Sequence, residues 1–406
     1  MNQIEGGVTA AKGFEAAAAA AGIKYQGRTD MALVYTKTPA VCAGTFTTNV
    51  VKAAPVLWDK EIVAKGDLVH AVVLNSGIAN ACTGEEGKRL NVAMAAAVAD
   101  QLQVEKEEVL TASTGVIGMQ LPLEPLQKGA ALLKEELSGS RAAAAAAAKA
   151  IMTTDTVPKE AAVSFDVDGV MVTVGGMSKG SGMIHPNMAT MLSVTTTDAA
   201  ISKEDLQELV SEAVSDSFNM ISVDRDTSTN DTYLVLANGE SGVMVKKGTK
   251  AYEDFRAALF YVSTELAKKM AADGEGATKL LEVKVTGCET EEKAKILSKS
   301  VITSNLVKTA VYGSDANWGR ILCALGYSGA EFDPEAIDLT LEAGDSSLVL
   351  VKDGVATDYR EETATELLSK EKVTVICDMK EGNCAATAWG CDLTYDYVKI
   401  NGDYRS

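Results

Sequence analysis

Histidine is nearly absent from this chain of 406 residues, which contains only His70 and His185. Most protein sites for zinc and other transition metals use several histidines, so this scarcity argues against a metal site. A serine–histidine–acid triad would depend on one of these two residues. His70 lies inside the apolar run LVHAVVLN, which is more typical of a histidine buried in a strand than of a catalytic one.

Positive charge is also in short supply. The 38 Lys and Arg residues face 56 Asp and Glu residues, and the formal net charge is −18. Neutralising nucleic-acid phosphates requires a clustered excess of basic side chains, so we expect no nucleic-acid partner. The seven cysteines form no CxxC pair, and their odd number favours reduced thiols in a cytoplasmic protein.

Long hydrophobic runs are missing as well. The nearest are the alanine runs Ala16–Ala21 and Ala142–Ala148, both far shorter than the roughly 20 residues that a membrane-spanning helix needs. The first residues, MNQIEGGVTAAKGF, lack the basic and apolar regions of a secretory signal. We therefore expect neither export nor a membrane partner, and the intrinsic preference of alanine predicts a helix for each run.

Strand-like and helix-like segments follow one another without a regular alternation. Helical periodicity is clearest after Ser202, whose hydroxyl can cap a helix, and over residues 252–272. This pattern predicts a layered α+β fold, a sandwich of sheets and helices, rather than a doubly wound parallel sheet. Apolar runs typical of strands lie at 68–75, 170–174, 232–237, 281–286, 337–342 and 373–378.

A candidate boundary lies in the stretch ADGEGATKL, which follows the second helix and precedes the strand-like run at 281–286. Exposed, glycine-containing connections of this kind commonly separate compact domains. We predict a catalytic domain over residues 1–280 and a smaller C-terminal α/β domain over residues 281–406.

Some polar segments resemble cofactor-binding loops without meeting their requirements. GGMSKGSG lacks the Lys-Ser/Thr pair that follows the last glycine of a P-loop, and His185 stands where a dinucleotide fingerprint needs its third glycine. The run from Asp224 to Thr232 lacks the glycine and the glutamate of a calcium loop. Its short polar side chains suit either an Asx-type turn or a turn that faces a substrate. We predict no resident cofactor or metal.

The stretch KGSGMIHPNMATML contains a small-residue pair, Ala189 and Thr190. If the chain is cut before Thr190, the new α-amine has an unperturbed pKa of about 7.7–8.0 and can activate the hydroxyl of its own residue. The same hydroxyl can make the cut by attacking the carbonyl of Ala189. Spacing alone still favours a buried glycine- and methionine-rich connector over such a nucleophile.

A nucleophile of this kind needs donors for the oxyanion that develops at the attacked carbonyl. STGVIG, which includes Thr114 and Gly115, offers backbone N–H groups beside a glycine. A strand-to-turn junction explains the same residues, and both interpretations stay open at this point.

Several blocks of the sequence together resemble the ornithine acetyltransferase family, in the family's order. The resemblance implies a self-cleaving, N-terminal-threonine acetyltransferase of arginine biosynthesis, which moves acetyl from N-acetylornithine to glutamate. A related self-processing aminopeptidase or amidase is the alternative. The blocks are GGVTAAKGF (6–14), NSGIANACTG (75–84), STGVIG (113–118), KGSGMIHPNMATML (179–192), VDRDTSTNDT (223–232) and NWGR (317–320).

The resemblance implies catalytic roles for matching residues. Thr190 is the expected nucleophile, and the bond between Ala189 and Thr190 is the expected cleavage point. Thr114 and Gly115 are the expected oxyanion hole, and His185 has no assigned proton-transfer role.

The resemblance also implies substrate contacts. A lysine such as Lys179 suits a substrate α-carboxylate, and a carboxylate such as Glu275 suits the ammonium group of ornithine. The expected contacts are Thr153, Lys179, Thr190, Glu275, Asn401 and Ser406.

The implied partners are the small molecules N-acetylornithine and glutamate, and two copies of each cleaved chain in one assembly, a heterotetramer. Acetyl-CoA serves some members as a second donor, and no CoA-binding signature is readable in this chain. The sequence departs from the family pattern at Ala11 in place of proline, Ile78 in place of asparagine, Arg225 in place of glycine and Ser406 in place of threonine.

Overall fold

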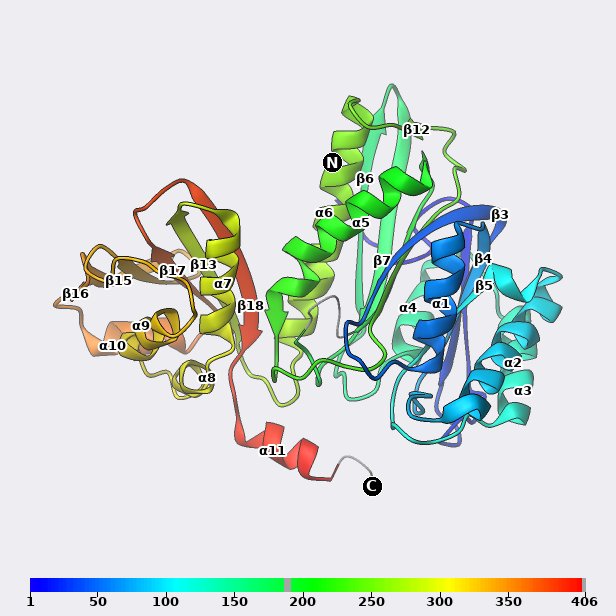
Figure 1. Cartoon of the computed structure of the whole chain (residues 1–406), viewed down its shortest axis with the longest axis horizontal. Coiled ribbons are helices and arrows are strands. Elements are labelled where there is room, and N and C mark those ends of the chain that lie inside the picture. Colours follow the sequence, from blue (N-terminus) through cyan, green and yellow to red (C-terminus); the bar gives the residue numbers. More distant parts are fainter. Residues whose placement is uncertain (186–190, 404–406) are drawn as a thin grey trace. The chain divides into compact units, whose positions relative to one another are not determined.

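The computed structural model describes residues 1–185 and 191–403, which form two compact units (Figure 1). Unit 1 contains residues 1–180, 191–219 and 227–266, and unit 2 contains residues 181–185, 220–226 and 267–403. The predicted division of the chain between residues 280 and 281 stays a prediction.

Unit 1 is built on a mixed sheet in which strands from distant parts of the chain lie side by side. The strands are β1 (Asn2–Ile4), β2 (Phe14–Ala19), β3 (Met31–Phe46), β4 (Val69–Asn75), β5 (Val109–Ser113), β6 (Lys159–Val167), β7 (Val170–Lys179), β8 (Leu192–Thr197) and β11 (Thr232–Ala237). Their order is β1-β6-β7-β8-β11-β3-β4-β5, with β2 paired to β3. β8 is antiparallel to β7 and parallel to β11, and β11 is antiparallel to β3. A short β9 (Ala200–Ile201) pairs with β12 (Met244–Val245).

Helices cover both faces of this sheet. They are α1 (Ala54–Lys65), α2 (Gly84–Leu102), α3 (Leu123–Glu135), α4 (Arg141–Ala150), α5 (Lys203–Asp216) and α6 (Lys250–Ala272). Val72 and Leu74 of β4 lie in one buried cluster with residues of α4, whereas Ala71 and Val73 lie in another with residues of α2 and α3. Successive side chains of a strand point to opposite faces, so a strand that is apolar throughout needs a covering layer on each side.

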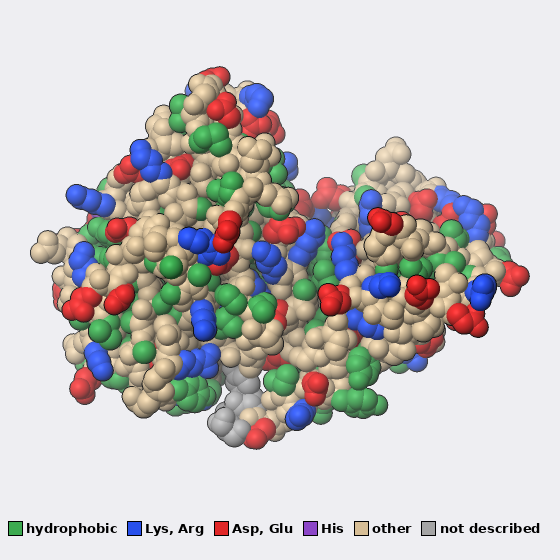
Figure 2. Space-filling model, turned by 180° about the vertical axis from the view of Figure 1, so that it is seen from behind, with side chains coloured by type: hydrophobic (Ala, Val, Ile, Leu, Met, Phe, Trp, Pro, Cys, Tyr) green, Lys and Arg blue, Asp and Glu red, His purple; other side chains and the backbone are tan. Residues whose placement is uncertain are grey.

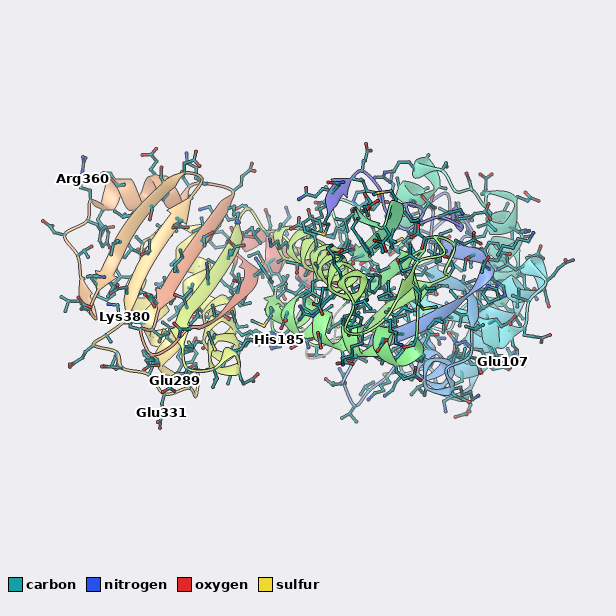
Figure 3. The ribbon with its side chains drawn as sticks, turned by 90° about the horizontal axis from the view of Figure 1, so that it is seen from above. Glu107, His185, Glu289, Glu331, Arg360 and Lys380 are labelled. Atoms are coloured by element: carbon teal, nitrogen blue, oxygen red, sulfur yellow. The ribbon has the colours of Figure 1, made fainter. Side chains whose placement is uncertain are left out.

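Unit 2 contains a smaller mixed sheet, whose strands are seen side by side in Figure 3. The strands are β10 (Ile221–Ser222), β13 (Leu280–Cys288), β14 (Asp338–Ala343), β15 (Ser346–Lys352), β16 (Val355–Ala356), β17 (Lys372–Asp378) and β18 (Cys384–Cys391). Their order is β10-β18-β13-β17-β14-β15-β16. The helices of this unit are α7 (Glu291–Ile302), α8 (Asn305–Tyr312), α9 (Trp318–Gly326), α10 (Glu361–Leu368) and α11 (Tyr395–Gly402).

The layered α+β architecture confirms the predicted fold class. Each predicted strand is present, and the run at 232–237 coincides with β11. The helix predicted after Ser202 is α5, and the hydroxyl of Ser202 accepts from the N–H of Asp205 at 3.1 Å, as a helix cap does. The helix predicted at 252–272 lies within α6.

The helix predicted for Ala16–Ala21 is wrong, because residues 14–19 form the strand β2. The helix predicted for Ala142–Ala148 is confirmed as α4. Ala16 of β2 lies in the same buried cluster as Ala144 and Ala147 of α4. Pairing with β3 and close packing of small side chains against α4 outweigh the weak intrinsic preference of alanine for a helix.

On the face seen in Figure 2, Lys and Arg side chains are mixed with Asp and Glu side chains rather than gathered in one region. Exposed ion pairs such as Lys88 with Glu85, at 2.7 Å, stabilise a fold little. Within the described residues, no helix is both long enough and apolar enough to cross a bilayer.

Candidate active site

A tight turn at the end of β5 carries the predicted oxyanion residues Thr114 and Gly115. The N–H of Thr114 donates to the carbonyl of Asn75 at 3.0 Å. The N–H of Val116 donates to the carbonyl of Gly77 at 3.1 Å. Between them, the N–H of Gly115 meets no acceptor among the described residues. This backbone donor is suited to stabilise a developing oxyanion.

Position 115 requires glycine. Its φ of 128° is one that other residues rarely adopt, and a Cβ there would lie 2.3 Å from the carbonyl carbon of Gly77. The hydrogen bonds just described hold the segment of Asn75 and Gly77 against the segment of Thr114 and Val116. The two segments therefore cannot separate to make room for a Cβ. The turn is a strand-to-turn junction, as one interpretation predicted, and it also presents the donor that the other requires.

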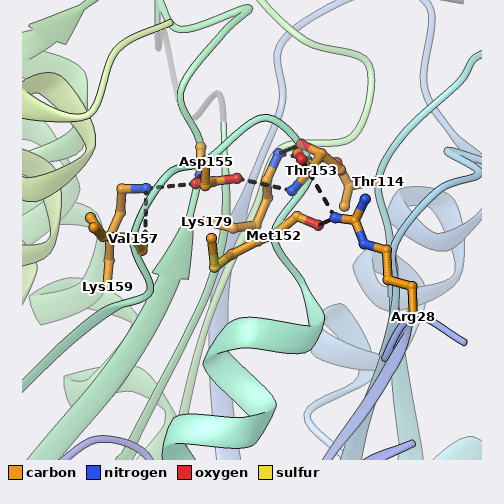
Figure 4. A network of polar contacts seen from close by, with 9 residues as sticks. Arg28, Thr114, Met152, Thr153, Asp155, Val157, Lys159 and Lys179 are labelled. Atoms are coloured by element: carbon orange, nitrogen blue, oxygen red, sulfur yellow. Dashed lines mark hydrogen bonds and ion pairs between the residues drawn. The ribbon is translucent and has the colours of Figure 1, made fainter. Parts of the chain in front are cut away.

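Lys179, the last residue of β7, lies beside this turn (Figure 4). Its ammonium group donates to the hydroxyl of Thr153 at 3.0 Å and to the hydroxyl of Thr114 at 3.3 Å. Only 8% of Lys179 is exposed, and burial strengthens hydrogen bonds that carry a charge. The fold thus brings Lys179, Thr153 and Thr114 together, although Thr114 and Lys179 are far apart in the sequence.

A buried carboxylate that the sequence analysis missed organises this cluster (Figure 4). Asp155 accepts from the ammonium of Lys159 at 2.6 Å and from the N–H of Gly180 at 2.7 Å. It also accepts from the N–H of Thr153 at 3.1 Å. Burial raises the pKa of Asp155, but the charges of Lys179 and Lys159 outweigh burial and lower this pKa to about 2. Asp155 is therefore ionised at neutral pH.

The run Asp224–Thr232 forms the hydroxyl-rich turns that one interpretation predicted. The N–H of Asn230 donates to the hydroxyl of Ser228 at 3.1 Å. The amide of Asn230 donates to the carbonyls of Ala79 and Ser113, at 2.6 and 2.8 Å. Asn230 therefore ties this run to the end of β5, directly before the oxyanion turn.

The residues that follow the predicted cleavage point lie against the same cluster. Leu192, the first residue of β8, is the register partner of Lys179 in the pairing of β7 with β8. Met191, which follows Thr190 in the sequence, is buried. The predicted nucleophile Thr190 and its neighbour Ala189 lie outside the described residues.

In unit 2, two predicted substrate residues, Glu275 and Asn401, lie together. Glu275 is 7% exposed, and the side-chain amide of Asn401 donates to its Oε2 at 2.7 Å. The N–H of Glu275 donates to the carbonyl of Ser181 at 2.9 Å. A Cβ at Gly182 would lie 2.3 Å from the carboxyl carbon of Glu275, so this glycine leaves the space that the carboxylate occupies. A buried carboxylate with an adjacent amide can bind an ammonium group.

The histidines have different surroundings. His70 lies on the strand β4, as predicted, but it is only partly buried, and its Nδ1 is 2.9 Å from a carbonyl of β3. His185, labelled in Figure 3, has its Nδ1 3.1 Å from the hydroxyl of Ser222. Burial, followed by the charges of Lys299 and Arg225, lowers the pKa of His185 to about 4, so it is neutral at pH 7 and a weak base. Among the described residues, no group of three or more His, Cys, Asp and Glu side chains is arranged to hold a metal ion.

The positions that depart from the family pattern are accommodated in different ways. Arg225 has a φ of 72°, the left-handed conformation that glycine adopts most easily, so the arginine retains a glycine-like turn. Ile78 is 2% exposed and forms an isolated β-bridge with Thr114 of the oxyanion turn. Ala11 is 1% exposed in the core of unit 1. Ser406 lies outside the described residues.

Comparison with known proteins places this site in a family. The model of the ArgJ family matches residues 15–406. The chain is 51% identical over 394 residues to the arginine biosynthesis bifunctional protein ArgJ 1 of Clostridium acetobutylicum, covering 97% of this chain and 96% of the relative. It is 47% identical over 416 residues to the glutamate N-acetyltransferase of Methanocaldococcus jannaschii, covering 100% of both chains.

A solved structure of ornithine acetyltransferase complexed with ornithine, from Mycobacterium tuberculosis, is 45% identical, covers 46% of this chain and 97% of that chain, and has a TM-score of 0.43. The resemblance noted in the sequence is confirmed by the family model and by the relatives that match along the whole chain. The chain belongs to the ArgJ family, whose members include arginine-biosynthesis enzymes and a glutamate N-acetyltransferase.

Proposed function

We propose that this chain is a glutamate N-acetyltransferase, which takes acetyl from N2-acetyl-L-ornithine and passes it to L-glutamate. Family membership and full-length relatives named for arginine biosynthesis and glutamate N-acetylation support this activity. The reaction exchanges one amine for another on the same acetyl group. It needs a nucleophile and an oxyanion hole, and it involves no change of oxidation state.

Thr190 becomes the nucleophile through self-cleavage. Its Oγ attacks the carbonyl of Ala189, the peptide nitrogen leaves as a new α-amine, and an ester then joins the two halves of the chain. Water hydrolyses this ester, which releases one chain that ends at Ala189 and another that begins at Thr190. The α-amine then accepts the proton of its own hydroxyl.

Acetyl transfer follows in two steps. Thr190 Oγ attacks the acetyl carbonyl of N-acetylornithine, and ornithine leaves with the proton that the α-amine had accepted. The neutral amine of glutamate then attacks the acetyl-threonine ester and gives a proton to the α-amine of Thr190. The α-amine returns this proton to Thr190 Oγ as the ester C–O bond breaks, and N-acetylglutamate leaves. Each step passes through a tetrahedral oxyanion, for which the N–H of Gly115 and the hydroxyl of Thr114 are suitable donors.

One observation carries this proposal: the first strand after Thr190 begins beside the oxyanion turn. Leu192 pairs with Lys179, and the ammonium of Lys179 reaches the hydroxyl of Thr114 at 3.3 Å. The described chain that follows Thr190 in the sequence is therefore joined through Lys179 to the turn that carries the proposed oxyanion donors.

The charges around Lys179 favour a substrate carboxylate. Lys159 is 1% exposed, Lys179 is 8% exposed, and the charge of each acts on the carboxylate of Asp155. A buried lysine ammonium such as that of Lys179 can bind a substrate α-carboxylate through charge-assisted hydrogen bonds. We assign the α-carboxylate of the substrate to Lys179 and Thr153, and the side-chain ammonium of ornithine to Glu275 and Asn401, with Ser406 as a further contact.

The two chains produced by cleavage would share one sheet. β8 and β11, which follow the cleavage point, lie between β7 and β3, which precede it. The backbone hydrogen bonds of β7 with β8 and of β11 with β3 therefore join the two chains without a covalent link. We propose that two copies of each chain form the active assembly, in the cytoplasm.

The aminopeptidase or amidase alternative is not favoured, because the full-length relatives are named as acetyltransferases and arginine-biosynthesis proteins. Acetyl-CoA as a second donor is part of the proposal, in line with the word bifunctional in the names of several relatives. Separate assays with N-acetylornithine and with acetyl-CoA as donor will distinguish one activity from two.

The variant Thr190→Ala tests the proposed nucleophile. We expect a single uncut chain on a denaturing gel and a loss of acetyl transfer of at least roughly a thousandfold, because the attacking oxygen is gone. Thr190→Ser is the matched control, since it retains a hydroxyl and should still yield two chains. A Thr190→Ala protein that is cut, or that transfers acetyl at the wild-type rate, would refute the assignment.

A further inference from the structure

The segment Ser181–His185 is part of the first cleavage product, but it packs with residues of the second. It precedes the proposed cut, yet it belongs to unit 2. The other described parts of unit 2, residues 220–226 and 267–403, follow the cut. After cleavage, this segment is therefore held in a unit that is otherwise built from the second chain.

The carboxylate of Asp224 accepts two of the hydrogen bonds that hold this segment. Its oxygens accept from the N–H of Met183 at 2.6 Å and from the N–H of Ile184 at 2.8 Å. The neighbouring N–H of Val223 donates to the carbonyl of Ile184 at 2.7 Å. Hydrogen bonds from backbone N–H groups to a carboxylate are charge-assisted and stronger than those between neutral groups.

The conformation that Asp224 holds is an unfavourable one. Met183 has a φ of 55°, in the left-handed region that a residue with a Cβ rarely adopts. Arg225, next to Asp224, has a φ of 72°. Strained residues persist where surrounding contacts compensate for them, and they are concentrated at functional sites. The hydrogen bond from the N–H of Met183 to Asp224 is such a contact.

Asp224 also contacts the helix that carries a predicted substrate residue. The hydroxyl of Tyr397 on α11 donates to Oδ2 of Asp224 at 3.3 Å. Burial, followed by the charges of Asp224 and Glu275, raises the pKa of Tyr397, so the phenol keeps the proton that it donates. One turn later on α11, Asn401 donates to Glu275 at 2.7 Å. The same carboxylate is thus bonded both to the segment before the cut and to the helix of Asn401.

We propose that Asp224 is a positioning residue for self-cleavage, which holds Met183 and Ile184 in one strained conformation ahead of the scissile bond. Attack on a peptide carbonyl requires a narrow range of geometries, and fixing part of the chain that leads to this carbonyl makes that range easier to reach. After the cut, the same hydrogen bonds keep Met183 and Ile184 of the first chain in unit 2. This inference rests on the proposed function for the cut itself.

The variant Asp224→Asn tests the role in cleavage. Asparagine has the same shape, but it offers only one acceptor oxygen, and its NH₂ group faces a backbone donor. We expect the precursor to be converted to two chains at least roughly tenfold more slowly than wild type, in line with the loss of a charge-assisted hydrogen bond. The matched control is Asp226→Asn, which removes the same charge from an exposed neighbour and should cleave within roughly twofold of wild type. Equal rates for the two variants would overturn the proposal.

Rescue by glycine separates positioning from general stabilisation of unit 2. Glycine adopts a positive φ without strain. The double variant Met183→Gly with Asp224→Asn should therefore be cleaved at least roughly threefold faster than the single variant Asp224→Asn. A general loss of stability would not be repaired in this way. Absence of any recovery would overturn the claim that Asp224 acts through the conformation of Met183.

A measurement without cleavage distinguishes this inference from the proposed function. In the uncut Thr190→Ala background, hydrogen exchange should show protected amides at Met183 and Ile184, and Asp224→Asn should remove this protection while β13 retains its own. If wild type is never cut, the proposed function and the role of Asp224 in cleavage both fail, and this result still decides whether Asp224 fixes the conformation of Met183 and Ile184. Unchanged protection at Met183 and Ile184, or loss of protection throughout β13, would overturn the proposal.

Discussion

Replacing Asp155 by asparagine is the most direct test of the polar network beneath the candidate site. Asp155 is 8% exposed and accepts from the ammonium of Lys159 and from the backbone N–H groups of Thr153 and Gly180. Asparagine keeps the volume and removes the charge. The variant therefore isolates the electrostatic part of the network from its packing.

The magnitude follows from the pKa of Asp155, which the fold lowers from 3.8 to about 2. A shift of this size corresponds to about 2 kcal/mol of stability at neutral pH, at roughly 1.4 kcal/mol for each pKa unit. Removing one partner of a buried ion pair lowers the free energy of unfolding by about 3–5 kcal/mol in measured cases, and this sets the upper end of the expected range. We expect Asp155→Asn to lower the free energy of unfolding by about 2 to 5 kcal/mol at pH 7.

The dependence on pH has a defined sign. The folded state lowers the pKa of Asp155, so its stabilising effect is complete above the unfolded value of 3.8 and is lost as the pH falls toward about 2. The difference in unfolding free energy between wild type and Asp155→Asn should therefore be largest above pH 4 and should narrow between pH 4 and pH 2.

Urea unfolding followed by the fluorescence of Trp58 measures this difference in unit 1. Trp318 and Trp389 are first replaced by phenylalanine, so that Trp58, which lies in unit 1, is the reporter. The control is Asp168→Asn, an exposed position with a φ of 52° that asparagine tolerates, and it should cost less than about 0.5 kcal/mol. The reasoning about the network is refuted if Asp155→Asn lowers the free energy of unfolding no more than this control does. It is also refuted if the difference in unfolding free energy between wild type and Asp155→Asn does not become smaller between pH 4 and pH 2.

Two further predictions concern the oxyanion turn and the buried ammonium. Gly115→Ala should reduce acetyl transfer by at least roughly a hundredfold in a kinetic assay, the typical effect of losing an oxyanion donor, because its Cβ would lie 2.3 Å from the carbonyl carbon of Gly77. Gly118→Ala is the control, with a φ of 86° and no atom within 4 Å of the added Cβ, and comparable activities of the two variants would contradict the steric argument. Lys179→Met should raise KM for N-acetylornithine by roughly tenfold to a hundredfold, as expected for a lost hydrogen bond to a charged group, and an unchanged KM would exclude Lys179 as the carboxylate contact.

Local sequence patterns predicted much of the secondary structure. The helix α5 was predicted because Ser202 supplies a cap and apolar residues recur at helical spacing, and both signals act within a few residues. The strand β11 was predicted because apolar and β-branched residues run without interruption from 232 to 237. Residues 16–19 were predicted incorrectly, because their state is decided by pairing with β3 and contact with α4, which lie elsewhere in the chain.

In the candidate site, too, some features could be predicted from the sequence and others depend on contacts between distant segments. Thr114, Thr153 and Lys179 could be named from the resemblance to the family, but the sequence could not show that the ammonium of Lys179 reaches the hydroxyls of both threonines. Asp155 gave no chemical signal of its own, because a carboxylate is a surface residue in most settings. Asp224 was recognised only as part of a turn, since its bonds to Met183 and Ile184 span a large separation in sequence.

Residue identity by itself determined the family, the helices and strands with strong local periodicity, and the set of residues that can carry acyl transfer. The tertiary structure alone decided that β8 and β11 lie between β7 and β3, that two lysines share one buried carboxylate, and that Arg225 and Met183 take glycine-like conformations. Local preferences are worth about 1 kcal/mol or less per residue. Strand order, burial and strain depend on contacts between distant segments, and these form only when the whole unit folds.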